Sequence, residues 1–201
     1  EWAYARNPTL ICTCHETIKL VAENPDNIYL GCKLKGDCDY RISGTRGEAK
    51  WISFNTFPGG GFGGGGRGTG TTLHEEQLAI NADGTFEVIL SQREHPGNWL
   101  RLEPDTASLT IRQTFHRKHK ERAAQIRIER INAIPEPPPT LTADVLEFVL
   151  GGCVQHARML TQIGAGWAER NASKPNVFWD AQEDDTKKFM DPQIKWQMAY
   201  L

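Results

Sequence analysis

Residues 108–115 read Ser-Leu-Thr-Ile-Arg-Gln-Thr-Phe, and apolar and polar side chains alternate along this stretch. In a β-strand, successive side chains point to opposite faces. Leu109 and Ile111 would therefore share one face, and Thr110 and Arg112 the other. This period of two predicts a strand with one buried and one polar face.

Similar patterns extend outward on both sides of this strand. Residues 51–57 are rich in aromatic side chains, and residues 85–90 follow Asp83-Gly84, a dipeptide that favours a type I′ hairpin turn. Further strands are predicted at residues 10–14, 17–21, 28–34, 40–42, 73–80 and 125–131. Residues 117–124 are charged and lack helix breakers, which predicts a short exposed helix. Many short strands separated by turns indicate a β-sandwich or a barrel.

A different pattern begins after the proline-rich residues 135–139, which read as a stiff linker. Thr140 or Thr142 can cap a helix there, and Gly164 and Gly166 are expected to end it. Apolar side chains recur along it at helical spacing, namely Leu146, Val149, Leu150, Cys153, Ala157 and Leu160. We expect this stripe to pack on the sandwich.

The predicted organisation is a mainly β protein with helical additions (α+β). Residues 1–134 form an antiparallel β-sandwich domain. Residues 135–201 form the linker, a long amphipathic helix and a C-terminal segment that packs on the sandwich. Residues 194–201 alternate like a half-buried strand. We expect them to pair with another strand of the sheet or to be buried at a subunit contact, and the chain to be an internal piece of a longer protein.

Composition limits the classes of function. The chain has 201 residues, of which 39% are hydrophobic and 24% charged, and its net charge is -2. This balance supports a real core and argues against a general nucleic-acid or anionic-membrane surface. The longest apolar run, residues 145–150, is too short to span a bilayer. The odd count of five cysteines fits a reducing compartment, so we expect a cytoplasmic protein.

The cysteines invite a metal hypothesis. Cys12, Cys14 and His15 lie together, and Cys32 and Cys38 follow. Structural zinc sites usually separate paired ligands by two to four residues, whereas one residue separates Cys12 from Cys14, which a regular strand would place on one face. Buried small side chains are the simpler interpretation. We predict no metal site and no cofactor.

A glycine-rich loop covers residues 59–70. It lacks the Gly-Lys-Ser/Thr ending of a phosphate-binding loop. A mobile loop is the simple interpretation, and a lid over a pocket, with Arg67 reaching the ligand, is the functional one.

Four more residues are candidates for binding. Trp51 and Trp99 can belong to the core or form the floor of a sugar-binding pocket. His74 precedes Glu75-Glu76, a base beside carboxylates. Arg112 can hold an anion through two hydrogen bonds. The predicted ligand-binding set is Trp51, Arg67, His74, Trp99 and Arg112, and the sequence singles out no catalytic residue.

The order of several motifs resembles a bacterial family known as domain of unknown function 1214. The motifs are residues 24–29 (NPDNIY), 40–44 (YRISG), 51–54 (WISF), 83–88 (DGTFEV), 97–100 (GNWL), 108–113 (SLTIRQ) and 127–130 (RIER). The resemblance covers about residues 20–165. It implies a jelly-roll-like sandwich with further strands after Tyr200, and it implies no activity. The cysteine-rich N-terminal part and the glycine-rich loop depart from it.

Three kinds of function are consistent with these patterns. The leading hypothesis is a domain that binds a small polar or carbohydrate-like ligand. The alternatives are a hydrolase or lyase that uses His74 or His95 with a carboxylate, and a structural domain that forms homo-oligomers.

Overall fold

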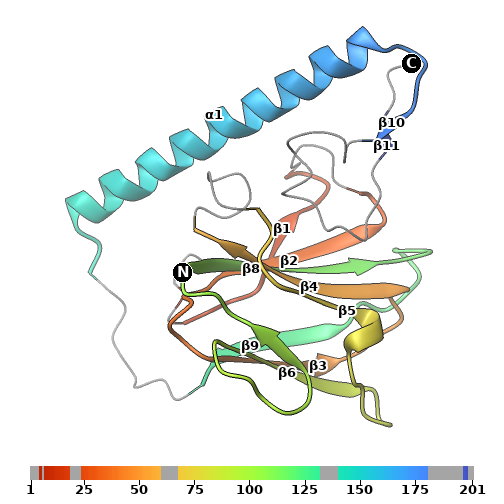
Figure 1. Cartoon of the computed structure of the whole chain (residues 1–201), viewed down its shortest axis with the longest axis vertical. Coiled ribbons are helices and arrows are strands. Elements are labelled where there is room, and N and C mark those ends of the chain that lie inside the picture. Colours follow the sequence, from red (N-terminus) through yellow and green to blue (C-terminus); the bar gives the residue numbers. More distant parts are fainter. Residues whose placement is uncertain are drawn as a thin grey trace.

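In the computed structural model, nine strands form two sheets that pack face to face (Figure 1). The structure describes residues 5, 7–18, 24–59, 68–131, 140–180 and 197–198. Within these ranges, the elements outside the sheets are one short 3₁₀ helix, one long α-helix and a separate pair of two-residue strands. The predicted class, mainly β with helical additions in a sandwich, is confirmed.

The larger sheet has five strands in the order β1-β2-β8-β4-β5, and every neighbouring pair is antiparallel. Its strands are β1 (Ile11–Cys14), β2 (Asn27–Lys33), β8 (Thr106–Thr114), β4 (Trp51–Pro58) and β5 (Thr72–His74). The short helix η1 (Glu75–Gln77) follows β5 directly.

The smaller sheet has four strands in the order β7-β6-β3-β9. They are β7 (Trp99–Arg101), β6 (Thr85–Ser91), β3 (Tyr40–Thr45) and β9 (Gln125–Arg130). The pair β6–β7 is parallel and the other pairs are antiparallel. This sheet therefore contains one parallel pair of strands, whereas the sequence predicted a sandwich with antiparallel pairs only.

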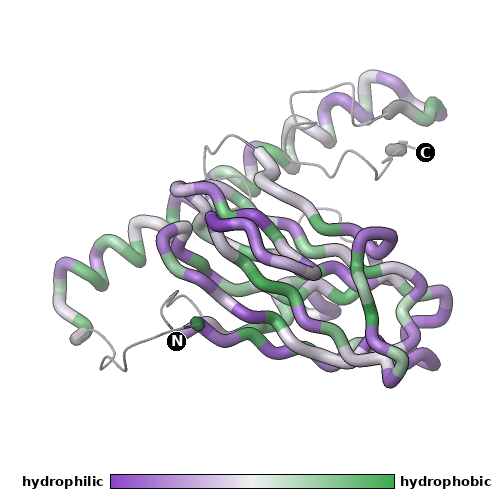
Figure 2. Tube along the Cα trace, turned by 60° about the horizontal axis from the view of Figure 1, so that its bottom comes forward, coloured by the Kyte–Doolittle hydropathy of each residue, from purple (hydrophilic) through white to green (hydrophobic). Residues whose placement is uncertain are grey.

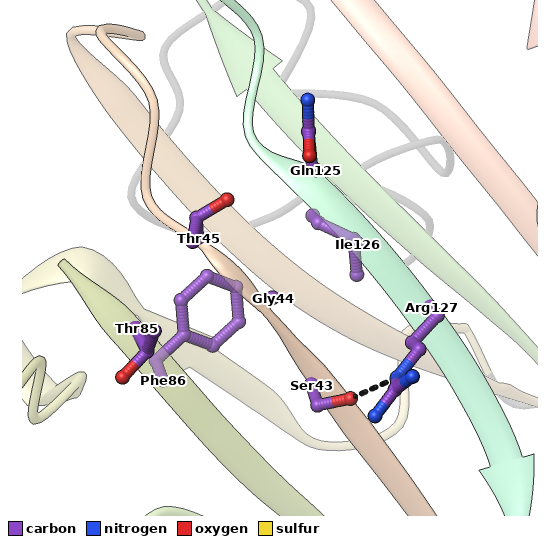
Figure 3. A pocket seen from close by; sticks show the side chains of 8 residues that line it. All are labelled: Ser43, Gly44, Thr45, Thr85, Phe86, Gln125, Ile126 and Arg127. Carbon is purple, nitrogen blue, oxygen red and sulfur yellow. Dashed lines mark hydrogen bonds between the residues drawn. The ribbon is translucent and has the colours of Figure 1, made fainter.

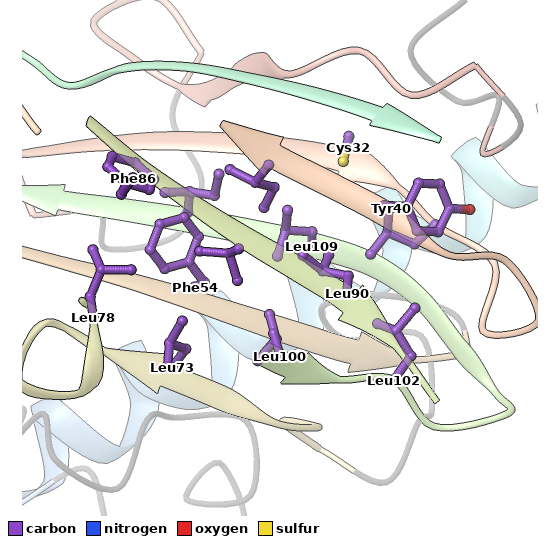
Figure 4. Packing of buried hydrophobic residues seen from close by; sticks show 14 of the residues in the cluster. Cys32, Tyr40, Phe54, Leu73, Leu78, Phe86, Leu90, Leu100, Leu102 and Leu109 are labelled. Atoms are coloured by element: carbon purple, nitrogen blue, oxygen red, sulfur yellow. The ribbon is translucent and has the colours of Figure 1, made fainter. Parts of the chain in front are cut away.

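The core lies between the two sheets (Figure 4). Strand β8 contributes Leu109 and Ile111, as its alternation predicts, and β6 contributes Phe86, Val88 and Leu90 from one face. Gln113 also lies on the inner face of β8, and its Oε1 accepts a hydrogen bond of 2.7 Å from the Ala124 backbone N–H. The acceptor of this buried amide is therefore satisfied, whereas its Nε2 has no hydrogen-bond partner among the described residues.

The prediction of a short helix over residues 117–124 is wrong, because these residues form a turn. One oxygen of the Glu121 carboxylate accepts hydrogen bonds from the backbone N–H groups of His116 and Arg117. The side chain thus satisfies backbone donors that a helix would have to leave free.

The Asp83-Gly84 turn is present, but it is not type I′. Only Gly84 has a positive φ, of 82°, whereas type I′ needs two such residues. The Asp83 carboxylate instead accepts hydrogen bonds from the backbone N–H and the hydroxyl of Thr85. The predicted strand over residues 73–80 is also shorter, because η1 replaces it after His74.

Helix α1 (Ala143–Ser173) is longer than predicted. Thr142 is the N-cap, and its Oγ1 accepts a hydrogen bond of 3.3 Å from the Val145 N–H. Gly164 and Gly166 lie inside the helix and do not end it. A glycine inside a helix costs about 1 kcal/mol, which the remaining turns of a helix this long can offset.

The predicted packing of the α1 stripe is wrong in this structure. Leu146, Val149 and Cys153 are exposed, Leu160 is half-buried, and no residue of α1 is buried. Apolar positions recur along the part of α1 that extends beyond the sandwich (Figure 2). Helical periodicity identifies residues that share a face, but it does not identify the surface that covers this face.

The C-terminal strand prediction is tested at two residues. Strand β11 (Gln197–Met198) pairs with β10 (Trp179–Asp180), antiparallel and apart from both sheets of the sandwich. Trp196 and Tyr200 lie outside the described residues.

Candidate functional site

Four side chains form a row across the five-stranded sheet, one from each of four neighbouring strands. The register pairs Tyr29 of β2 with Arg112 of β8, Arg112 with Ser53 of β4, and Ser53 with His74 of β5. Directly paired residues lie on the same face of a sheet. The adjoining residues Ile111 and Phe54 belong to the core, so this row lies on the outer face.

This outer face is polar and yet largely covered. Ser53 is 0% exposed, Asn55 3% and His74 7%. The face looks toward the side of the sandwich on which α1 lies (Figure 1). Polar side chains that are buried in this way must be satisfied by partners, which makes the face a specific structure rather than an ordinary solvated surface.

Hydrogen bonds connect part of this face. The Ser53 hydroxyl donates to Asn55 Oδ1 at 3.1 Å, and the Asn55 amide donates to the Thr72 hydroxyl at 2.9 Å. These bonds fix the amide orientation, with its nitrogen toward β5. The floor of the candidate site is therefore preorganised by the sheet itself.

Trp51 and His74 lie in contact at one end of the row. Their ring centroids are 5.6 Å apart and their planes are inclined by 33°. Trp51 is half-buried, so part of its indole remains open to a ligand. An aromatic surface beside hydroxyl and imidazole groups is the combination that binds polar molecules with an apolar face, such as sugars.

Arg112 occupies the middle of the row. Its guanidinium carbon lies 5.5 Å from the centroid of the Tyr29 ring, which orients the planar group by a cation–π contact. Its Nε and Nη1 are buried and have no hydrogen-bond partner among the described residues. The prediction that Arg112 lies on the polar face of its strand is confirmed.

Glu75, the first of the two carboxylates after His74, is bound by other groups. Glu75 is held by Arg46, whose Nε and Nη2 each donate to one of its oxygens at 2.9 Å. The Ile52 backbone N–H also donates to Glu75 Oε2, at 3.0 Å. Glu75 therefore anchors η1 to β4.

The other predicted residues lie elsewhere or outside the described part of the chain. Trp99 is in the four-stranded sheet, paired with Ile89 on the outer face, and its Nε1 donates to the Ser91 carbonyl at 3.0 Å. The structure thus brings together Trp51, His74 and Arg112, but not Trp99. Arg67 lies outside the described residues, as does most of the glycine-rich loop.

A shallow depression of about 410 Å³ lies on the four-stranded sheet (Figure 3). It centres on Gly44, between Phe86 and Ile126, and Arg127 Nε donates to the Ser43 hydroxyl at 2.8 Å beside it. A Cβ at Gly44 would lie 2.3 Å from the Gln125 carbonyl oxygen, so glycine is required there by packing. The depression is open and poor in converging polar groups, which makes it the weaker candidate.

None of the five cysteines forms a disulfide. Cys32 and Cys38 belong to the core, as the simpler interpretation predicted, and burial raises the pKa of Cys32 to about 12. A β-bulge between Cys12 and Cys14 places them opposite adjacent residues of β2, so they do not share a face. Among the described residues, no three His, Cys, Asp or Glu side chains are grouped to hold a metal ion.

Tyr29, Ser53, Asn55 and Thr72 were missed by the sequence analysis. The alternation along each strand could have placed these four residues on the outer face. In the structure, each of them pairs with another outer-face residue of a neighbouring strand. Strand order was needed to place them side by side. Sequence spacing alone does not give that order.

The class of protein defined by this geometry is a two-sheet β-sandwich with a polar outer face and an added long helix. No family model and no curated protein matches the chain. An uncharacterised protein from Burkholderia cenocepacia has a similar crystal structure, with 35% sequence identity and a TM-score of 0.89 over 98% of this chain. A Vibrio parahaemolyticus protein is 12% identical over 51% of this chain and 30% of its own, with a TM-score of 0.39.

The chain spans 54% of the length of the Burkholderia protein. In the part of the chain that the structure describes, no helix combines the length and hydropathy needed to cross a bilayer.

Proposed function

We propose that the outer face of the five-stranded sheet binds a small polar, carbohydrate-like ligand. The observation that carries this proposal is the row Tyr29, Arg112, Ser53 and His74, which joins four strands into one polar surface beside the Trp51 ring. A sugar has hydroxyl groups for such polar side chains and an apolar face for an indole.

Binding is tested by thermal unfolding with a panel of neutral monosaccharides and disaccharides. A ligand that binds only the folded chain raises its midpoint as concentration increases. We expect at least one sugar to do so, and Trp51→Ala to weaken its binding about tenfold, equivalent to about 1.4 kcal/mol. Trp99→Ala is the matched control, because Trp99 lies on the other sheet.

A second candidate function is self-assembly through α1. Phe148 is 83% exposed, and Val145, one turn before it, connects it to a stripe of exposed side chains on the same helix: Leu146, Val149, Leu150 and Val154. A contiguous apolar surface of this kind marks an interaction site, and we propose a second copy of the chain as its partner.

Sedimentation velocity tests this assembly. The chain is expected to self-associate with increasing concentration, and Phe148→Glu is expected to yield monomers. Phe178→Glu is the control, because Phe178 is 72% exposed but lies beyond the end of α1. Equal sedimentation of the chain and its Phe148 variant would rule out α1 as the interface.

Two further proposals concern the family and the location of the protein. We propose that the chain belongs to the domain of unknown function 1214 family, and the order of its motifs is the only support for this proposal. The odd count of five cysteines supports a reducing compartment, and we propose the cytoplasm.

A further inference from the structure

Two arginines occupy comparable positions in the two sheets but have different surroundings. Arg41 lies on the outer face of β3, and Arg112 on the outer face of β8. Arg41 is paired with Glu87 at 3.1 Å and with Glu129 at 3.4 Å. Arg112 has Tyr29 and Ser53 as its direct cross-strand neighbours, and neither carries a negative charge.

The difference extends to the whole five-stranded sheet. None of its five strands contains an aspartate or a glutamate, whereas β6 and β9 of the other sheet each contribute one. The charge of Arg112 is thus not balanced within its own sheet. Two of its nitrogen atoms are buried without an acceptor among the described residues, a state that costs free energy until an acceptor is supplied.

We infer that Arg112 binds an oxyanion of the ligand, so that the ligand class is an acidic sugar or a similar polar acid. This inference rests on the proposed ligand-binding face. Tyr29 orients the guanidinium group by its ring, and Ser53 is the cross-strand neighbour of Arg112 on the other side. The planar guanidinium matches a carboxylate, sulfate or phosphate through two hydrogen bonds. Arg112 as a whole is half-buried.

The test compares glucose with three sugars that carry an oxyanion at the C6 position. Glucose, glucuronate, glucose 6-sulfate and glucose 6-phosphate are titrated by calorimetry at constant ionic strength. We expect at least one acidic sugar to bind at least ten times more tightly than glucose. The acid that binds most tightly identifies the oxyanion.

The variants assign this preference to one residue. Arg112→Gln is expected to remove the preference and Arg112→Lys to retain part of it, because lysine keeps the charge but not the planar pair of donors. Arg41→Gln is the matched control and should keep the full preference. If Arg112→Gln fails to fold, the lysine variant and the ligand series still decide the question.

Several results would overturn the inference. Equal binding of glucose and the acidic sugars would overturn it and leave the proposed function intact, whereas no binding of any sugar would overturn both. The acidic residues Glu183, Asp184 and Asp185 are a competing source of carboxylate within the chain. If replacing these three by amides destabilises the chain as much as Arg112→Gln, with no further loss on combination, the partner of Arg112 is internal and the inference fails.

Discussion

At the scale of single residues, the environment of a charged side chain decides its role. Glu75 follows His74 in the sequence, yet it pairs with Arg46 and with the Ile52 backbone. Residue type and adjacency suggested a catalytic pair, but successive residues at the end of a strand point in different directions. The partner of Glu75 lies 29 residues away and is found only through the fold.

Replacing Glu75 by glutamine is expected to destabilise the sandwich by about 2 kcal/mol, since hydrogen bonds to charged groups are lost. The side chains of Arg46 and Glu75 are 13% and 26% exposed, so solvent compensates only partly. Urea unfolding measures the change. Glu48→Gln is the control, because the Glu48–Arg122 pair is largely exposed and should contribute little. Equal effects of the two variants would contradict the structural role of Glu75.

The five thiols should differ in reactivity toward an aromatic disulfide reagent at pH 8. Cys12 and Cys153 are exposed and are expected to react quickly. Cys32 should remain protected, because with a pKa of about 12 only about one thiol in ten thousand is ionised at this pH. We expect two fast thiols in the native chain and five in denaturant. Cys153→Ser should remove one fast thiol, and reaction of three or more would contradict the burial of Cys14, Cys32 and Cys38.

At the scale of elements, alternation predicted the strands well and connections poorly. Leu109, Ile111 and Phe86 were placed on the correct faces because burial of one face imposes a period of two. The turn after β8 was mistaken for a helix because its charged residues favour helix formation. The carboxylate of Glu121 stabilises this turn by accepting hydrogen bonds from two backbone N–H groups.

The candidate site shows the same division between what sequence can and cannot predict. The alternation along residues 108–115 predicted the polar face for Arg112, whereas the sequence assigned no face to Trp51 or His74. The proximity of the three residues was not predicted either, because it depends on the order β8-β4-β5 and on the register that pairs Arg112 with Ser53 and Ser53 with His74. Strand order is set by the packing of the whole core, which one sequence does not reveal.

At the scale of the whole molecule, the core and the long helix are separate features. The buried core cluster extends from Cys32 to Ala124, and α1 contributes no buried residue to it. The Burkholderia protein matches 98% of this chain with a TM-score of 0.89, so this arrangement occurs in a second, 35% identical protein. In this chain, α1 leaves its apolar side chains exposed, which is the observation behind the proposed self-assembly.

A chain that ends at residue 139 is therefore expected to fold. It keeps every strand of both sheets of the sandwich and every residue of the core cluster, and it loses only α1 and the residues C-terminal to it. Because burial of apolar side chains is the main source of stability, its unfolding free energy should change by less than about 1 kcal/mol. Urea unfolding monitored by tryptophan fluorescence measures this change.

A chain that ends at residue 120 is the control, since it lacks β9 at the edge of the four-stranded sheet and should not unfold cooperatively. Loss of cooperative unfolding in the longer chain would show that α1, through its half-buried residues such as Leu160 and Trp167, is an integral part of the domain.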